Sequence, residues 1–158
     1  NGVVGYADGL LVGHELDGSV WHVGNLGRDT NVTFQEVIAD GGAAWADGLT
    51  IKGDMLYVTQ NLENLIGVFE LSVDNDIIKT TFANNLTSPD FYTPATSAIY
   101  GDYIYSTNSR FADLPEITEP ANNTVIGIRL MRETETSKAI VTTVTVSVPA
   151  LLLAMFAL

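Results

Sequence analysis

Short hydrophobic runs alternate with Gly, Asp and Asn along most of the chain. β-Branched and aromatic residues dominate these runs, and no stretch before residue 139 has the 3.6-residue period of an amphipathic helix. The pattern therefore predicts β-strands joined by tight turns. The predicted strands are Gly2–Val4, Leu10–Gly13, Val20–Val23, Thr33–Ile38, Leu49–Lys52, Met55–Thr59, Ile66–Leu71, Ile78–Ala83, Ser97–Tyr100, Tyr103–Thr107 and Val125–Leu130.

These strands fall into a repeat. The segment Asn1–Val4 returns 46 residues later as Asp47–Thr50, and Asp8 returns as Asp54 at the same shift. A shift of 48 residues then carries Asp54 onto Asp102. A period of this length, filled by four short strands, is typical of β-propeller blades. We therefore expect an all-β fold, a partial β-propeller of about three four-stranded blades with a C-terminal apolar tail.

The third unit contains an insertion, because its third strand follows 60 rather than 48 residues after that of the second unit. The extra residues lie in 111–123 and include Pro115 and Pro120. Two interpretations are open. The loop, stiffened by its prolines, could cover one face of the propeller, or it is a tolerated surface insertion.

The character of the chain changes after Leu130. Residues 131–138 form a short polar spacer, and residues 139–158 contain no charged side chain. This tail is long enough to span a bilayer and also suits a GPI-attachment signal. Against both, Val144, Val146 and Val148 alternate with Thr and Ser as in a strand, which Pro149 then breaks. We expect a propeller region over 1–130, a spacer over 131–138 and a tail over 139–158, and we keep both interpretations of the tail.

Composition excludes several classes of function. The net charge of −12 argues against nucleic-acid binding, which needs Lys and Arg, and would repel an anionic membrane surface. An acidic surface suits cations, neutral small-molecule ligands or simple solubility. The chain has no cysteine, so disulfides, thiolate catalysis and zinc–thiolate sites are excluded.

Three glycosylation sequons, at Asn31, Asn85 and Asn122, each lie in a predicted loop and weakly favour an extracellular or cell-surface location, although chance also produces such triplets. The chain starts inside its first repeat, so we expect it to be a piece of a longer protein.

The strongest candidates for chemistry are Asn1 and Asp47, which hold the same place in successive repeats. Each stands at the start of an innermost strand, and these strands converge on one mouth of a propeller channel. Their oxygens could ligate a hard cation such as Ca²⁺. Alternatively, each caps a turn through nearby backbone N–H groups. The third unit has Ala95 at this position and offers no further ligand of this kind.

The ends of the second strands should lie beside the starts of the first, because the two run antiparallel. This expectation brings five polar side chains to the same mouth as candidate substrate-binding residues. Among them, Arg110 could hold a carboxylate or phosphate, and His14 could shuttle protons or be an ordinary polar residue of the rim. His22 lies inside a predicted strand and is interpreted as structural. The five candidates are His14, Gln60, Asn61, Asn108 and Arg110.

Several motifs in order carry a family likeness. They are Asn1–Val3, Ala46–Leu49, Leu56–Asn61, Leu86–Phe91, Thr93–Thr96 and Tyr105–Phe111. On these residues, the chain to about residue 130 resembles the senescence-marker-protein/gluconolactonase/strictosidine-synthase-like superfamily of six-bladed β-propellers. The resemblance implies that the chain is the C-terminal half of a ring whose N-terminal half is missing. It also implies that Asn1 and Asp47 are metal ligands, joined by a Glu from the missing first blade.

The resemblance implies a metal-dependent lactonase-like hydrolase, in which a divalent metal, taken as Ca²⁺, polarises a lactone carbonyl. No general base is identified. The alternative is a non-catalytic extracellular propeller that binds a ligand or partner and is tethered to a membrane through 139–158.

Overall fold

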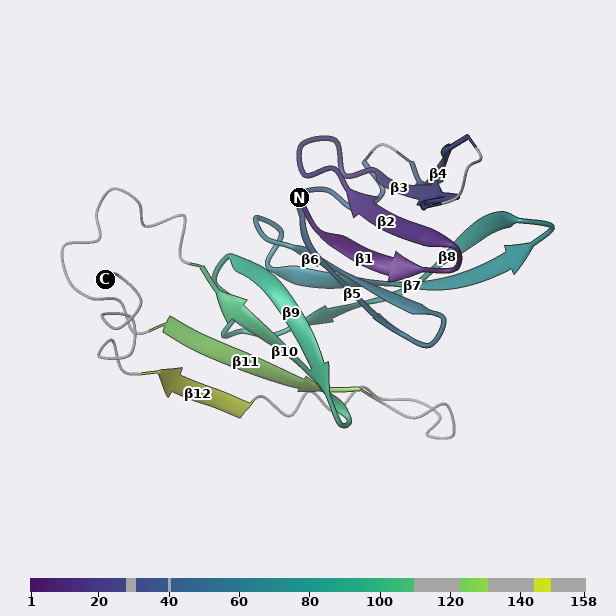
Figure 1. Cartoon of the computed structure of the whole chain (residues 1–158). Helices are drawn as coiled ribbons and strands as arrows, with labels where there is room; N and C mark the ends of the chain where they lie inside the picture. Colours follow the sequence, from purple (N-terminus) through teal and green to yellow (C-terminus); the bar gives the residue numbers. More distant parts are fainter. Residues whose placement is uncertain (28–30, 40, 110–122, 131–143, 149–158) are drawn as a thin grey trace, which may run out of the picture.

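The computed structural model describes residues 1–27, 31–39, 41–109, 123–130 and 144–148, and every regular element in these ranges is a strand. The strands form three four-stranded antiparallel sheets, each with its strands in chain order along the sheet (Figure 1). The first sheet is β1 (Val3–Tyr6), β2 (Gly9–Gly13), β3 (Val20–Gly24) and β4 (Thr33–Ile38). The second is β5 (Ala46–Lys52), β6 (Met55–Gln60), β7 (Leu65–Asp74) and β8 (Ile77–Thr87). The third is β9 (Pro94–Tyr100), β10 (Tyr103–Asn108), β11 (Asn123–Arg129) and β12 (Val144–Val148).

The same two-residue turn joins the first two strands of every sheet. It consists of Ala7-Asp8, Gly53-Asp54 and Gly101-Asp102, and its first residue has a positive φ of 53°, 58° and 60°, respectively. A positive φ at the first central residue belongs to the II′ hairpin turn, whose twist matches that of the flanking strands. Glycine adopts this conformation without strain, whereas the alanine of the first sheet does not.

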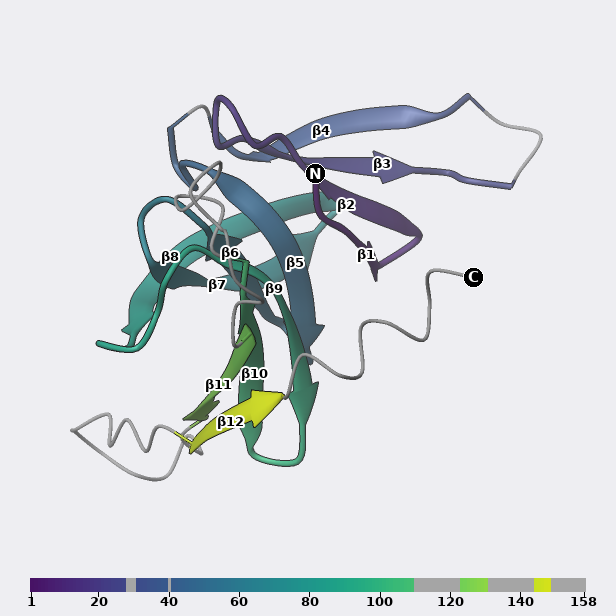
Figure 2. The same ribbon diagram turned by 90° about the vertical axis from the view of Figure 1, so that its left-hand side faces the viewer.

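Two hydrophobic clusters hold the three sheets together. Leu11 and Val20 of the first sheet pack with Leu56 and Val58 of the second. The opposite face of the second sheet packs its Tyr57, together with Ile66 and Val68, against Ile104 and Ile126 of the third. The second sheet therefore lies between the other two, as Figures 1 and 2 show.

Successive first strands approach each other backbone to backbone. A Cβ added at Gly2 would lie 2.6 Å from the backbone nitrogen of Leu49, and one added at Gly48 would lie 2.9 Å from Cα of Thr96. Glycine is therefore required at both places. This close approach brings the start of β1 beside the start of β5, and the start of β5 beside that of β9.

The outer face of the first sheet is apolar and uncovered within the described structure. Val3, Val12 and Trp21 are cross-strand neighbours on it, as are Leu10, Val23 and Phe34. Trp21 is 39% exposed and Phe34 69% exposed. In the second sheet, the residues that correspond by the 46-residue shift to Val3, Leu10 and Val12 are Leu49, Leu56 and Val58, and all three are buried against the first sheet.

Every strand predicted from the hydrophobic pattern is present, with shifted ends. β7 and β8 are longer than predicted because they pair with each other as far as Asp74 and Ile77. Tyr57 packs between the second and third sheets.

The apolar C-terminal segment contributes a strand that closes the third sheet. Val144–Val148 pairs with β11, in agreement with the strand interpretation of its alternating valines. Residues 131–143 and 149–158 lie outside the described residues, as does most of the proline-containing insertion. Within the part of the chain that the structure describes, no helix is long and apolar enough to cross a membrane.

Candidate functional site

A β-bulge sets the position of Asp47. Ala46 pairs with Gln60 and Gly48 pairs with Thr59, so Asp47 is an extra residue between two regular pairs. Trp45, immediately before β5, has a φ of +59°, and its carbonyl accepts a hydrogen bond from the backbone N–H of Asn61 at 3.2 Å. A bulge redirects the side chain of the extra residue. Here it lets Asp47 reach the end of β6.

Four polar side chains from the first two sheets meet at this place. The amide nitrogen of Asn1 donates to Oε2 of Glu15 at 2.9 Å. The amide nitrogen of Asn61 lies between two carboxylates, 3.1 Å from Oε1 of Glu15 and 3.4 Å from Oδ2 of Asp47. We call these residues the Asp47 cluster: Asn1, Glu15, Asp47 and Asn61.

Burial and charge both act on Asp47. Burial raises the pKa of its carboxyl above the ordinary value of 3.8, and the nearby Glu15 carboxylate raises it further. The Asn61 amide and the positive charge of the chain's first residue lower this pKa, but they do not cancel the increase. Two carboxylates held by one buried amide form a site of concentrated negative charge, which a bound cation would stabilise.

The donors of the Asp47 cluster fit a hard divalent cation. Two carboxylates and two side-chain amides supply only oxygen ligands, the set that Ca²⁺ uses, and the cluster has no sulfur or imidazole. Over the described ranges, no group of three His, Cys, Asp or Glu side chains is arranged to hold a metal. The amide oxygen of Asn61 accepts from the backbone N–H of Leu62 at 2.7 Å, so a cation here would depend on the amide oxygen of Asn1 as well as on the two carboxylates.

The turn-capping interpretation of Asp47 has no support in its contacts. Its only hydrogen bond in the described structure is the one from the Asn61 amide. Asp17 makes the contact that capping requires, since its Oδ1 accepts from the backbone N–H of Ser19 at 2.8 Å.

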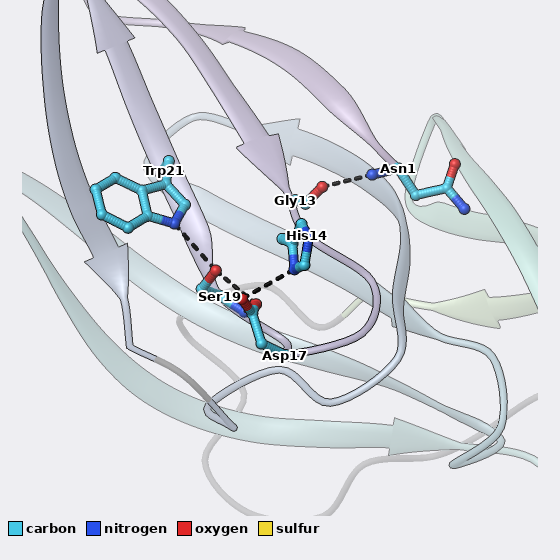
Figure 3. A network of polar contacts seen from close by, with 6 residues as sticks. All are labelled: Asn1, Gly13, His14, Asp17, Ser19 and Trp21. Atoms are coloured by element: carbon cyan, nitrogen blue, oxygen red, sulfur yellow. Dashed lines mark hydrogen bonds and ion pairs between the residues drawn. The ribbon is translucent and has the colours of Figure 1, made fainter.

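His14 takes part in a different network at the end of β2. Its Nδ1 lies 2.9 Å from Oδ2 of Asp17, whose Oδ1 also accepts from the hydroxyl of Ser19 at 2.7 Å. That hydroxyl in turn accepts from the indole of Trp21 at 3.0 Å. The hydrogen bonds from Ser19, followed by those from His14, lower the pKa of Asp17. Figure 3 shows His14 turned toward Asp17, while the Asn1 amide extends away from it.

The remaining candidates lie apart from the cluster. The amide of Gln60 lies over β7, where it would be 2.9 Å from a Cβ at Gly67. Asn108 binds its own sheet, accepting from the N–H of Tyr92 and donating to the carbonyl of Asp90 and the hydroxyl of Thr124. Arg110 lies outside the described residues. Of the four predicted side chains that the structure describes, Asn61 alone has a hydrogen bond with Asp47.

The glycosylation candidates are placed in part. Asn31 and Asn85 are both exposed, but Asn85 lies within β8, paired with Gly67 of β7, rather than in the predicted loop. Asn122 lies outside the described residues.

Sequence reasoning missed Glu15, although the repeat contained the signal. The shift of 46 residues that matches His14 to Gln60 also matches Glu15 to Asn61. The cluster thus consists of equivalent pairs from two sheets, Asn1 with Glu15 and Asp47 with Asn61. The third sheet has Ala95 and Ser109 at these places and adds no charge.

Comparison with protein-family models, with curated proteins and with solved structures finds no match.

Proposed function

We propose that the three sheets are consecutive blades of a β-propeller of the gluconolactonase-like kind. The 46- and 48-residue repeat, the recurring II′ turn and the face-to-face packing of the sheets support this proposal. The second sheet uses one of its faces to pack against the first sheet. The equivalent face of the first sheet is its outer face, which is uncovered within the described structure. In the proposed ring it receives a further blade, which belongs to the N-terminal half.

The function proposed for this region is that of a metal-dependent, lactonase-like hydrolase. The observation that carries it is the convergence of the Glu15 and Asp47 carboxylates on one buried amide, that of Asn61. Asn1 and Asp47 are the proposed ligands, and the carboxylate of Glu15 lies where it could join them. A bound Ca²⁺ would supply Lewis-acid polarisation of a lactone carbonyl.

The chain's own residues have simpler roles. Asn61 holds the two carboxylates at fixed positions, and the bulge presents Asp47 to them. The close approach at Gly2 keeps β1 against β5, so that Asn1 and Asp47 stay on one rim. Preorganised ligands of this kind do not have to be ordered when a cation or substrate arrives.

A second candidate function is favoured by the position of His14. A hydrolase needs a group that takes a proton from the attacking water. No general base is identified, and His14, which could shuttle protons, lies in a network with Asp17 that is separate from the Asp47 cluster. The alternative proposal is a non-catalytic, cation-dependent propeller that binds a small ligand at the same rim.

Calcium titration followed by isothermal calorimetry tests the shared part of both proposals. We expect one site per chain, loss of binding in Asp47→Asn, and normal binding in Glu70→Gln, which removes an exposed charge from the middle of β7. Equal binding by both variants would mean that calcium associates with the acidic surface in general.

Hydrolysis of a simple γ- or δ-lactone with and without calcium then separates the two functions. Calcium-dependent turnover that Asp47→Asn abolishes supports the hydrolase. Calcium binding without turnover supports the ligand-binding propeller.

A further inference from the structure

A second concave site lies at the other end of β1 from Asn1. It is a cavity of about 570 Å³ between the first two sheets, formed by the β1–β2 turn, the adjoining ends of β3 and β4, and the β7–β8 hairpin, all on the right-hand side of Figure 1. This volume is within the usual range for a small-molecule pocket. The residues on which its chemistry depends are Asp8, His22, Asn25, Thr33, Gln35 and Asp76.

Two departures from the repeat create this cavity. In the strand register, His22 takes the place that Val68 has in the second sheet and Gly127 in the third. Gly24 takes the place of the long side chains of Glu70 and Arg129. At the first of these positions, the other sheets have an aliphatic side chain or none, and the first sheet has the imidazole of His22. At the second position, the other sheets have a charged side chain, and the first sheet has none.

The space above Gly24 is where the polar groups converge. A Cβ placed there would lie 2.7 Å from the hydroxyl of Thr33, 2.9 Å from Cε1 of His22 and 3.3 Å from Oδ1 of Asp8. The other carboxylate oxygen of Asp8 accepts from the N–H of Asn25 at 3.1 Å, which fixes its orientation. The pocket is therefore built before any ligand enters it.

His22 has an unsatisfied nitrogen in this pocket. The residue is only 6% exposed, and its Nε2 has no hydrogen-bond partner in the described structure. Oδ1 of Asp8 lies 3.5 Å from it, close enough for an ionic attraction if the imidazole is protonated but not in a hydrogen-bonding arrangement. A buried polar atom without a partner costs free energy, and a ligand that binds it would recover that cost.

The wall of the pocket joins the two sheets. The amide of Gln35 donates to the carbonyl of Ile78 at 2.5 Å and accepts from the N–H of the same residue at 3.0 Å. Both sheets therefore contribute to one site, with Asp8 on the first and Asp76 on the second.

We propose that this pocket binds the ammonium group of a small amine. Two carboxylates, Asp8 and Asp76, line it beside the buried Nε2 of His22. An alkylammonium group has three donors, which can be shared between Asp8, Nε2 of a neutral His22 and the hydroxyl of Thr33. The described side chains provide no metal-binding group of three His, Cys, Asp or Glu here, which favours an organic cation over a metal ion.

Titration with 1,4-diaminobutane, followed by NMR chemical shifts and calorimetry, tests the proposal. We expect saturable binding with shifts centred on Asp8, His22 and Gly24, and no binding of the neutral analogue 1,4-butanediol. Nα-acetyl-lysine amide distinguishes a free amine from a lysine side chain of a peptide, since either can supply the ammonium group.

Two variants should weaken binding of the diamine about tenfold, the loss expected for one charge-assisted hydrogen bond. Asp8→Asn removes the charge, and His22→Val introduces the residue that the second sheet carries at this register position, which favours correct folding. Asp76→Asn tests the opposite wall if Asp8→Asn proves unstable. Asp54→Asn is the matched control, because Asp54 occupies the same turn in the second sheet and does not line this pocket.

Three results would overturn the proposal. They are binding of the diol as tight as that of the diamine, an equal loss of diamine binding in Asp54→Asn and Asp8→Asn, and no saturation up to roughly 10 mM diamine, where even a millimolar site would be filled.

Discussion

Replacing Asp47 by Asn distinguishes a cation-binding role of this residue from a turn-capping role, because the two roles predict opposite effects on the stability of the protein. Its carboxylate and that of Glu15 contact the same nitrogen, at 3.4 and 3.1 Å, so the two oxygens are at most about 6.5 Å apart. With an effective dielectric constant between that of water and that of a protein surface, two charges at this separation repel by about 1–2 kcal/mol. Without a cation, the Asn61 amide and the positive charge of the chain's first residue offset this repulsion only in part.

Asp47→Asn should therefore stabilise the calcium-free protein at pH 7 by about 1 kcal/mol, raising its melting temperature by about 2–4 °C. The effect depends on pH. The folded state raises the pKa of Asp47 above 3.8, so the folded protein binds more protons than the unfolded chain between the two pKa values, and stability falls as pH rises through that window. The advantage of Asp47→Asn should shrink as pH falls through the folded pKa and vanish below 3.8.

The assay is thermal unfolding in a chelator from pH 7 down to just below the ordinary pKa of 3.8, with Glu70→Gln as the control for net charge. Calcium should reverse the order, because only the protein with Asp47 gains stability from a bound cation. At a calcium concentration 100 times the dissociation constant, the gain is about 2.7 kcal/mol. An Asp47→Asn variant less stable than the parent in chelator at pH 7 would refute this reasoning and restore the turn-capping interpretation.

Three further substitutions test the fold. Leu56→Ala should lower the free energy of unfolding, measured with denaturant, by about 2–5 kcal/mol, because Leu56 is fully buried between the first two sheets. The control Leu62→Ala, at an exposed turn, should change it by less than about 0.5 kcal/mol. Equal effects of the two substitutions would contradict the packing. Gly48→Ala should destabilise the protein by about 1–3 kcal/mol, since its Cβ would press on the backbone at Thr96, and an unchanged melting temperature would show that β5 and β9 are not in close contact. Trp21→Thr should reduce binding of a hydrophobic dye, and undiminished dye fluorescence would show that the outer face of the first sheet is covered.

The sequence predicted the strands well because each strand is a short hydrophobic run between turn residues, and in the second sheet both faces of such a run are buried. Leu56 and Tyr57, adjacent in β6, are both buried, one against the first sheet and the other against the third. Strand ends were less predictable, since they depend on the partner strand. Pairing with β7 extends β8 to Thr87 through exposed polar residues whose pattern has no hydrophobic signal. The strand character of Val144–Val148 was visible, but its place beside β11 follows from pairing across a long sequence separation.

The sequence predicted where the candidate site lies better than it predicted which side chains form it. The repeat placed Asn1 and Asp47 on one rim, and the close approach at Gly2 realises that placement. It could not show that Gln60 and Asn108 turn toward their own sheets, because side-chain direction at a strand end depends on local bulges and turns. Glu15 was overlooked because its repeat partner is Asn61, an amide rather than an acid, although both can ligate a cation through oxygen.

A crystal structure grown with calcium would test the central claim most directly. The account predicts one ion on the rim shared by the first two sheets, with a carboxylate oxygen of Asp47 and the amide oxygen of Asn1 each within about 2.3–2.6 Å of it. A calcium ion bound elsewhere, or Asp47 still hydrogen-bonded only to Asn61 at saturating calcium, would contradict it.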